Sequence, residues 1–485
     1  MTDQEQPEAD VTTKPAEPSD DFVTTSHSLG DLHYTVTTGR IVLREEVFEK
    51  DTFTGIKSKA ELSITAYTRD GADAAQRPVT FAFNGGPGSS SAWLHLGVLG
   101  PRRVEAPDAE VDLAPPYTLT DNHETLLRDS DLVFIDPIST GYSRPSEGNE
   151  AKPYLGYKGD IESVAEVIRL WTTRNNRWLS PKFLAGESYG TTRAAGLAAY
   201  LQRRFAMYLN GVMLISPVLD FGTLRFTDHN DQPYSLFLPT YAAIAHYHGM
   251  HEGRELSDVL DEAERYASDT LPWVLSRGAR LSADERAEAV ATIARLTGLS
   301  QEYVDSVDMR IEHIRFYTQL LRHKRMSVGR LDGRFTGHEA DYGRERFGSD
   351  PFTDAIAGAY AAGINHYVRA ELEYHNDLHY ELISDAGSKW SYTDFEGRNI
   401  SVADRLAEAM RMNPHLRVHV GCGYYDGGTP HAAAEYTMAR LAIPEHLRNN
   451  IEFKYYEAGH MMYVHAQSRL AQSRHLSEFV TGGGS

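Results

Sequence analysis

The stretch Phe183-Leu184-Ala185-Gly186-Glu187-Ser188-Tyr189-Gly190-Thr191 decides the fold that this sequence predicts. A short apolar run meets the pattern G-x-S-x-G, and small and apolar residues at 194–200 then favour a helix. The two glycines allow a tight turn between strand and helix, so the hydroxyl of Ser188 is expected to project above the edge of a sheet. Because Gly and Ser are common in loops, the pattern alone is weak and needs support from other stretches.

Strand and helix patterns alternate on both sides of this stretch. Helical spacing predicts a helix over 157–178, and alternation of apolar and polar residues at 34–42 and 60–67 is typical of half-buried antiparallel strands. Short apolar runs predict strands at 79–83, 132–135, 183–185, 212–215, 417–420 and 451–455. The expected fold class is therefore α/β, with a mostly parallel central sheet flanked by helices.

The periodicity becomes almost entirely helical between residues 223 and 395. Helices are predicted there at 256–267, 283–296, 304–321 and 355–372. The sequence thus predicts an α/β core made of residues 26–222 and 396–481, interrupted by a helical cap insertion at 223–395. Helices at 402–412 and 464–476 complete the core. Residues 1–25 are polar and acidic and predict a disordered tail, and residues 482–485, Gly-Gly-Gly-Ser, are linker-like.

Composition limits the binding partners and the cellular compartment that we expect for this protein. The 485 residues carry a net charge of −20, and an acidic surface repels phosphate backbones, so no nucleic-acid partner is expected. The most apolar windows, such as 355–364, are too short to cross a membrane. The single cysteine, Cys422, excludes an intramolecular disulfide, and the N-terminus lacks the apolar segment of a secretory signal. We therefore expect a cytoplasmic protein, with export by a route not visible in this sequence as the alternative.

Candidates for a catalytic triad follow the strands in a definite order. A serine hydroxyl needs an adjacent base, and that base needs an orienting carboxylate. α/β-Hydrolases supply these in the chain order Ser, Asp, His. Here Asp426 follows the predicted strand 417–420, and His460 follows 451–455. Asp426 alone has the simpler interpretation of a turn residue in an Asp-Gly pair, and His431 and His465 are competitors for His460.

The glycine-rich stretch 84–91, Asn-Gly-Gly-Pro-Gly-Ser-Ser-Ser, follows an early strand. A tight turn capped by serines and a phosphate cradle are two alternatives to a catalytic loop. The phosphate-binding pattern G-x-x-x-x-G-K-[ST] requires a lysine, and none follows these glycines. In a hydrolase, such a loop directs backbone N–H groups at the oxyanion of a tetrahedral intermediate.

Together these stretches resemble the serine carboxypeptidase family (peptidase family S10) of the α/β-hydrolase fold, in a disulfide-free bacterial-type form. The resemblance covers the loop 82–91, the elbow 186–190, Asp426 and the histidine loop 458–461, and the stretch 134–143 is also similar. Two residues depart from the family pattern. Ala82 replaces a tryptophan, which changes one wall of the substrate-carboxylate pocket, and Ser89 replaces a cysteine.

The resemblance implies roles for eight residues and implies no cofactor or metal. They are Ser188 as nucleophile, His460 as general base and acid, Asp426 as its orienting carboxylate, the N–H groups of Gly86 and Tyr189 as oxyanion hole, and Asn84, Gly85 and Glu187 as the site for a substrate carboxylate. A carboxylate beside Glu187 must share a proton with it in a desolvated site, and this favours acidic pH.

Three functions follow from these assignments. The leading hypothesis is a serine-type carboxypeptidase that hydrolyses C-terminal residues from peptides through an acyl-enzyme. An esterase or acyltransferase on the same scaffold is the alternative within enzymes, and a catalytically silent binding module is the alternative outside them. A peptide substrate is the expected partner, and the sequence leaves the formation of a homo-oligomer open.

Overall fold

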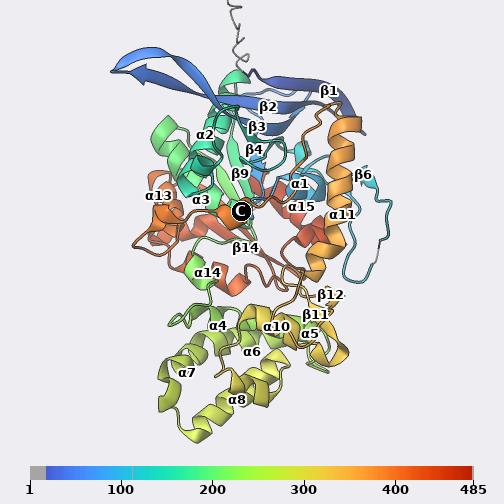
Figure 1. Cartoon of the computed structure of the whole chain (residues 1–485), viewed down its shortest axis with the longest axis vertical. Helices are drawn as coiled ribbons and strands as arrows, with labels where there is room; N and C mark the ends of the chain where they lie inside the picture. Colours follow the sequence, from blue (N-terminus) through green and yellow to red (C-terminus); the bar gives the residue numbers. More distant parts are fainter. Residues whose placement is uncertain (1–17, 112, 483–485) are drawn as a thin grey trace, which may run out of the picture.

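A central sheet runs through the larger part of the molecule in the computed structural model, which describes residues 18–111 and 113–482 (Figure 1). Its ten described strands follow the order β1-β2-β3-β7-β4-β9-β10-β13-β14, with β8 paired to β3. The strands from β7 to β14 in this order are parallel, whereas β1, β2 and β3 pair antiparallel with their neighbours. The bounds are β1 (Asp21–Leu29), β2 (Leu32–Glu49), β3 (Thr52–Arg69), β4 (Val79–Phe83), β7 (Asp131–Ile135), β8 (Arg144–Pro145), β9 (Lys182–Glu187), β10 (Gly211–Ile215), β13 (Arg417–Gly423) and β14 (Ile451–Tyr456). This mostly parallel mixed sheet confirms the predicted α/β class.

Helices cover both faces of the sheet. The helices α2 (Tyr157–Arg174), α3 (Tyr189–Phe205), α13 (Ala403–Met412) and α14 (His431–Ala439) share one apolar cluster with Leu184 of β9. The opposite cluster contains Phe183 and Ala185 of the same strand and includes α1 (Ala92–Leu94), α11 (Pro351–His366) and α15 (Ala466–Thr481). Successive residues of β9 thus enter opposite cores, and burial on both faces explains why its sequence is continuously apolar rather than alternating.

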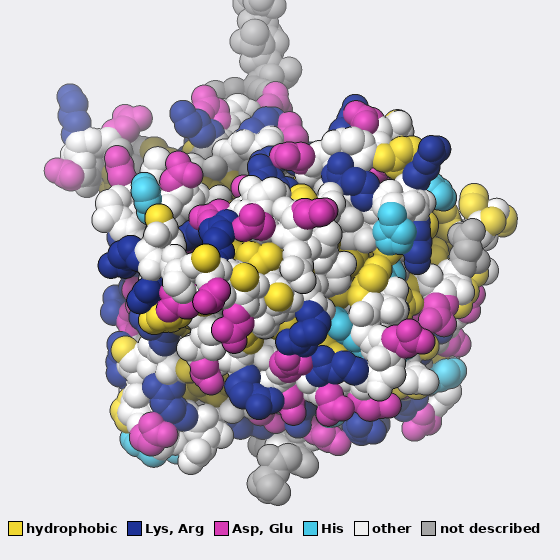
Figure 2. Space-filling model, turned by 90° about the horizontal axis from the view of Figure 1, so that it is seen from below, with side chains coloured by type: hydrophobic (Ala, Val, Ile, Leu, Met, Phe, Trp, Pro, Cys, Tyr) yellow, Lys and Arg dark blue, Asp and Glu magenta, His cyan; other side chains and the backbone are white. Residues whose placement is uncertain are grey.

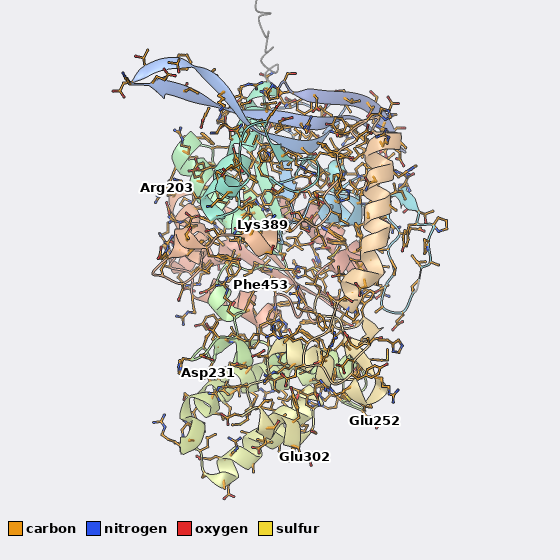
Figure 3. The ribbon with its side chains drawn as sticks, in the orientation of Figure 1. Arg203, Asp231, Glu252, Glu302, Lys389 and Phe453 are labelled. Atoms are coloured by element: carbon orange, nitrogen blue, oxygen red, sulfur yellow. The ribbon has the colours of Figure 1, made fainter. Side chains whose placement is uncertain are left out.

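A separate helical lobe, residues 224–350, extends from one end of the core (Figure 1). It has its own apolar cluster, which also takes in Tyr425 from the core. Its elements are α4 (Gln232–Leu236), α5 (Leu238–Tyr247), α6 (Leu256–Asp269), α7 (Leu271–Arg277), α8 (Ala283–Thr297), α9 (Gln301–Ser306), α10 (His313–Gln319) and the small pair β11 (Met326–Val328) and β12 (Thr336–His338). In Figure 3, Asp231 lies at the end of the lobe that faces the core, and Glu302 lies farther out.

The segment predicted as one helical cap, 223–395, is divided in the structure. Phe352, Ile356 and Tyr360 of α11 pack into the core cluster rather than into the lobe. The short helix α12 (Ala386–Lys389) also lies over the core, as the label on Lys389 shows (Figure 3). The single helix predicted over 304–321 is wrong as well. Asp308 and Met309 have φ of 51° and 61°, a left-handed conformation that ends α9 and separates it from α10.

The predicted disordered tail also needs a correction, because residues 21–25 belong to β1. This strand pairs with β2 along its whole length, and the carboxylate of Asp21 accepts hydrogen bonds from the Arg40 side chain at 3.0 and 3.2 Å. The carboxylate of Asp21, which counted toward the predicted disorder, is therefore bonded to the sheet. The rest of the predicted tail up to residue 17, and residues 483–485, lie outside the described residues.

Three further features concern the helices, the single cysteine and the surface charges. None of the described helices combines the length and the apolar character that a membrane span requires. Cys422 is buried near the end of β13. Seen from the lobe end, acidic and basic side chains are interspersed over the surface (Figure 2). The cytoplasmic location and the oligomeric state stay predictions.

Candidate active site

Ser188 sits at the tight turn between β9 and α3 with a strained backbone. Its φ and ψ are 59° and −128°, a conformation that side chains other than glycine rarely adopt. The flanking glycines are needed because a Cβ on Gly186 would lie 2.2 Å from the carbonyl oxygen of Gly190, and one on Gly190 would lie 2.7 Å from that of Phe83. The geometry is that of a strand-turn-helix elbow, as the sequence predicts.

His460 and Asp426 form a buried hydrogen-bonded pair. Nδ1 of His460 lies 2.8 Å from Oδ2 of Asp426. The other carboxylate oxygen accepts hydrogen bonds from the backbone N–H groups of Gly428 at 2.8 Å and Thr429 at 2.9 Å, and the Thr429 hydroxyl donates to Oδ2 at 2.7 Å. Burial lowers the pKa of His460. The charge and the hydrogen bond of Asp426 raise this pKa by more than burial lowers it, so the net shift is upward.

Hydrogen bonds tie the turn at Ser188 and the loop that carries His460 to the carboxyl end of β10, the strand between β9 and β13. The N–H of Ser188 donates to Ile215 at the end of β10 at 3.0 Å. The next residue, Ser216, donates its hydroxyl to the carbonyl oxygen of His460 at 2.6 Å and its N–H to Gly421 of β13 at 2.8 Å. Ser216, which the sequence analysis did not single out, thus fixes the histidine loop beside the elbow. Within the described residues, neither the Ser188 hydroxyl nor Nε2 of His460 makes a hydrogen bond.

The two competing histidines are engaged elsewhere. His431 is fully buried, and its Nε2 lies 3.0 Å from Oε1 of Glu264 in the lobe. Nδ1 of His465 lies 2.8 Å from the hydroxyl of Ser468. The structure therefore brings His460, and not these two, to Asp426.

The glycine-rich loop lies directly against the elbow. A Cβ on Gly85 would be 2.4 Å from the backbone nitrogen of Tyr189, so only glycine allows this approach. The N–H of Gly86 has no acceptor within the described chain. The N–H of Tyr189, the first residue of α3, is one of those that a helix leaves without an internal acceptor. Two backbone donors are thus available beside Ser188.

Asn84 and Glu187 form a second buried pair behind the serine. The side-chain amide of Asn84 donates to Oε1 of Glu187 at 2.8 Å, while Oε2 is buried and has no hydrogen-bond partner in the part of the chain that the structure describes. Burial raises the pKa of Glu187 to about 7, although the positive charge that His460 can carry acts in the opposite direction. The hydroxyl of Tyr463 lies close enough to lower this pKa and is itself buried without a hydrogen bond of normal geometry. The pocket therefore holds unsatisfied donor and acceptor capacity.

A buried ion pair between Arg193 and Asp160 holds the backbone of Asn84 in place. Arg193 of α3 donates from Nη1 to the carbonyl oxygen of Asn84 at 2.6 Å, and from Nε to Asp160 at 2.9 Å. Both charged side chains are almost completely buried. The sequence analysis missed this pair, although a lone arginine within the small apolar stretch 191–199 is a signal that could have indicated it.

A turn of the lobe, residues 330–334, holds the histidine loop. The carbonyl oxygen of Leu331 accepts a hydrogen bond from the N–H of His460 at 2.6 Å. The carboxylate of Asp332 accepts one from the N–H of Gly459 at 3.1 Å. We call residues 330–334 the lobe turn.

The lobe turn also contacts the aspartate loop. The carbonyl oxygen of Arg330 accepts a hydrogen bond from the N–H of Gly427, and the N–H of Gly333 donates to the carbonyl oxygen of Tyr425, both at 3.0 Å. The loops that carry Asp426 and His460 are therefore both bonded to the same short segment of the lobe.

Buried charges stiffen the lobe turn itself. Nη2 of Arg334 lies 2.6 Å from Oδ2 of Asp332 and 3.2 Å from Oδ1 of Asp108. The side chain of Asp332 is fully buried and that of Arg334 nearly so. Breaking such a pair leaves an uncompensated buried charge, so this network fixes the turn in one arrangement.

A mostly parallel sheet with a strained serine elbow, and an Asp–His pair at its carboxyl edge, defines an α/β-hydrolase of the serine type. The chain belongs to the serine carboxypeptidase family, Peptidase S10, whose family model matches residues 66–472. It is similar to the crystal structure of Kex1(delta)p, described as a prohormone-processing carboxypeptidase from Saccharomyces cerevisiae. The TM-score is 0.58 and the identity 14%, over 93% of this chain and 91% of that one.

Other solved structures match with lower TM-scores. They include the peroxisomal α/β-hydrolase Lpx1 of Saccharomyces cerevisiae, with 11% identity, a TM-score of 0.39 and coverage of 96% of this chain and 90% of that one. Comparison of the sequence with curated proteins gave no match.

Proposed function

We propose that this member of the serine carboxypeptidase family removes C-terminal residues from peptides through an acyl-enzyme on Ser188. Membership of the family supports hydrolysis of peptides. The observation that carries the finer assignment is the Asn84–Glu187 pair next to Ser188, in which Oε2 of Glu187 is buried and has no hydrogen-bond partner among the described residues. Such a group has no task in a simple esterase, but it can receive the free carboxylate of a peptide.

In the acylation step, Nε2 of His460 takes the proton of the Ser188 hydroxyl while Oγ bonds to the scissile carbonyl carbon. The carbonyl oxygen becomes an oxyanion, which the N–H groups of Gly86 and Tyr189 stabilise by hydrogen bonds. His460 then gives its proton to the leaving amine, and the C–N bond breaks. Asp426 stabilises the imidazolium in between, and this is consistent with the raised pKa of His460.

Deacylation repeats these steps with water. His460 takes a proton from the water molecule as its oxygen bonds to the acyl carbon, and the Ser188–acyl bond breaks when His460 returns the proton to Oγ. The free peptide acid leaves, so bonds and protons balance over the cycle without any further reactant.

Recognition of the C-terminal carboxylate sets the pH dependence of binding. A protonated Glu187 can donate a hydrogen bond to a substrate carboxylate, whereas two ionised carboxylates would repel each other in this desolvated pocket. With a Glu187 pKa of about 7, the binding-competent form is present below that value and is lost as the pH rises through it. Asn84 provides a second donor at the same place.

The experiment that tests the proposal compares a free-carboxylate peptide with its C-terminal amide across pH, on the wild type and on Glu187→Gln. For the wild type, kcat/KM on the free peptide should fall as the pH rises through about 7, with the amide less affected. The glutamine variant keeps a donor without titrating, so its preference for the free peptide should persist to higher pH. Equal efficiency and equal profiles for both substrates on the wild type would instead favour the esterase or acyltransferase alternative.

A further inference from the structure

Arg330, the first residue of the lobe turn, has a charged side chain without a hydrogen-bonded or ion-paired partner among the described residues. It is half-buried, and its guanidinium takes part in no ion pair or hydrogen bond with residues 18–111 or 113–482. Its backbone is held on both sides. The N–H donates to Oδ1 of Asp350 at 2.7 Å, and the carbonyl oxygen accepts from Gly427 at 3.0 Å. The side chain therefore starts from a fixed point beside the aspartate loop.

The guanidinium lies close to the Asp–His pair. A Cβ on Gly428 would lie 3.4 Å from Nη1 of Arg330 and 3.2 Å from Oδ1 of Asp426. The charge of Arg330 also acts to lower the pKa of His460. A Cβ on Gly428 would also lie 2.9 Å from Cδ2 of Leu331, so the Leu331 and Arg330 side chains pack closely against the aspartate loop at this glycine.

The two carboxylates near Arg330 already accept hydrogen bonds from other groups. Asp426 is bonded to His460 and Thr429, and Asp350 accepts hydrogen bonds from the backbone of Arg330 and from the hydroxyl of Thr353 at 3.1 Å. A half-buried guanidinium without a partner is costly, and this cost is relieved when an anion binds it. The planar group is suited to a carboxylate, which it can bind through two parallel hydrogen bonds.

The position of Arg330 indicates which half of a bound peptide would lie near its guanidinium. His460 is bonded to Asp426 through Nδ1 and interacts electrostatically with Glu187. Arg330 is on the Asp426 side. If the C-terminal carboxylate occupies the Asn84–Glu187 pocket, the acyl half of the peptide extends away from that pocket.

We propose that Arg330 binds the acidic side chain of the residue that supplies the acyl group, so that peptides with Glu or Asp before the scissile bond are preferred substrates. This inference rests on the proposed carboxypeptidase activity. It names the substrate class of that site and makes Arg330 a specificity-determining residue supplied by the lobe.

The test measures kcat/KM on three peptides that end in Glu-Phe, Gln-Phe or Lys-Phe and are otherwise identical. The wild type should prefer Glu over Gln by about tenfold, the scale of one charge-assisted hydrogen bond. Arg330→Gln should remove this preference without changing the melting temperature, because the side chain has no internal partner. Arg330→Glu should favour the Lys peptide. The matched control is Arg265→Gln, an exposed arginine of α6 whose loss changes the net charge equally and should leave the preference intact.

Two outcomes overturn the inference in different ways. Equal cleavage of the Glu and Gln peptides by the wild type, or an equal loss on all three peptides in Arg330→Gln, would mean that Arg330 only tunes His460, and the carboxypeptidase assignment would survive. Failure to release phenylalanine from any of the three peptides, with ester hydrolysis intact, would overturn the proposed function and this inference with it.

Discussion

The carboxylate of Asp332 accepts a hydrogen bond at 3.1 Å from the backbone N–H of Gly459, the residue before His460. A side chain of the helical lobe is therefore bonded to the loop that carries His460. A Cβ on Gly459 would lie 2.4 Å from the Asp332 side chain, so the two loops are in direct contact. The lobe thus contributes to the position of His460, the proposed general base.

Asp332→Asn should lower kcat/KM by about ten- to a hundredfold, because small displacements of a catalytic group are this costly. The loss should fall on kcat rather than on KM, since the Asp332 carboxylate bonds to Arg334 and Gly459 and, within the described residues, not to Asn84 or Glu187 of the proposed carboxylate site. The measurement is steady-state kinetics together with a melting curve that shows the variant is folded. Asp305→Asn, which breaks an exposed ion pair with Arg286 in the same lobe, serves as control. A folded Asp332→Asn with unchanged kcat would rule out the positioning role.

Thr429→Val removes the hydroxyl that donates to Oδ2 of Asp426 at 2.7 Å. The less stabilised carboxylate then attracts the imidazolium more strongly, so the pKa of His460 should rise further and the acidic limb of kcat/KM should move to higher pH. We also expect kcat to fall by about tenfold, the scale of a hydrogen bond to a charged group. Thr429→Ser keeps the hydroxyl and should restore the wild-type profile. Identical pH profiles for valine and serine would show that the hydroxyl has no such effect.

Glu187 should make the folded state less stable as the pH rises. Its pKa is about 7 in the folded protein against 4.5 for an unperturbed glutamate, so the folded state binds the proton more tightly. The stabilisation of the folded state by the proton on Glu187 is therefore complete below pH 4.5 and is lost as the pH rises from 4.5 through 7. Glu187→Gln should gain roughly 2–3 kcal/mol of unfolding free energy relative to the wild type between pH 5 and 8.

Urea unfolding at both pH values measures this difference. Glu302→Gln, at an exposed position on α9 in the outer part of the lobe (Figure 3), should show no comparable change. A stability difference between Glu187→Gln and the wild type that is independent of pH would contradict a carboxyl group with this raised pKa.

Local sequence could predict the elements that have a distinct pattern of their own, such as a short apolar run or a turn between two glycines. The strand β4 has the predicted bounds, and the elbow at Ser188 has the strained turn that its glycines indicated. That Asp426 and His460 lie together could be predicted because each follows a strand of the parallel sheet, where the carboxyl ends meet.

The elements that the sequence analysis missed depend on contacts between distant residues. Asp332 and Gly459 are 127 positions apart, and nothing in the local pattern of either residue indicates the other. The same holds for Arg193 and Asp160, a pair formed between two helices. The helical period over 304–321 concealed a break, because apolar residues recur at helical spacing on both sides of the left-handed residues Asp308 and Met309.

The most direct test of the central claim is fluorophosphonate labelling of the protein, with the modified residue located by peptide mass mapping and the release of C-terminal residues followed in parallel. We predict one adduct per chain, on Ser188, with peptide hydrolysis lost in proportion to labelling, and neither label nor hydrolysis in a folded Ser188→Ala variant. A stoichiometric adduct on another serine, or continued release of C-terminal residues after Ser188 is fully modified, would contradict the account.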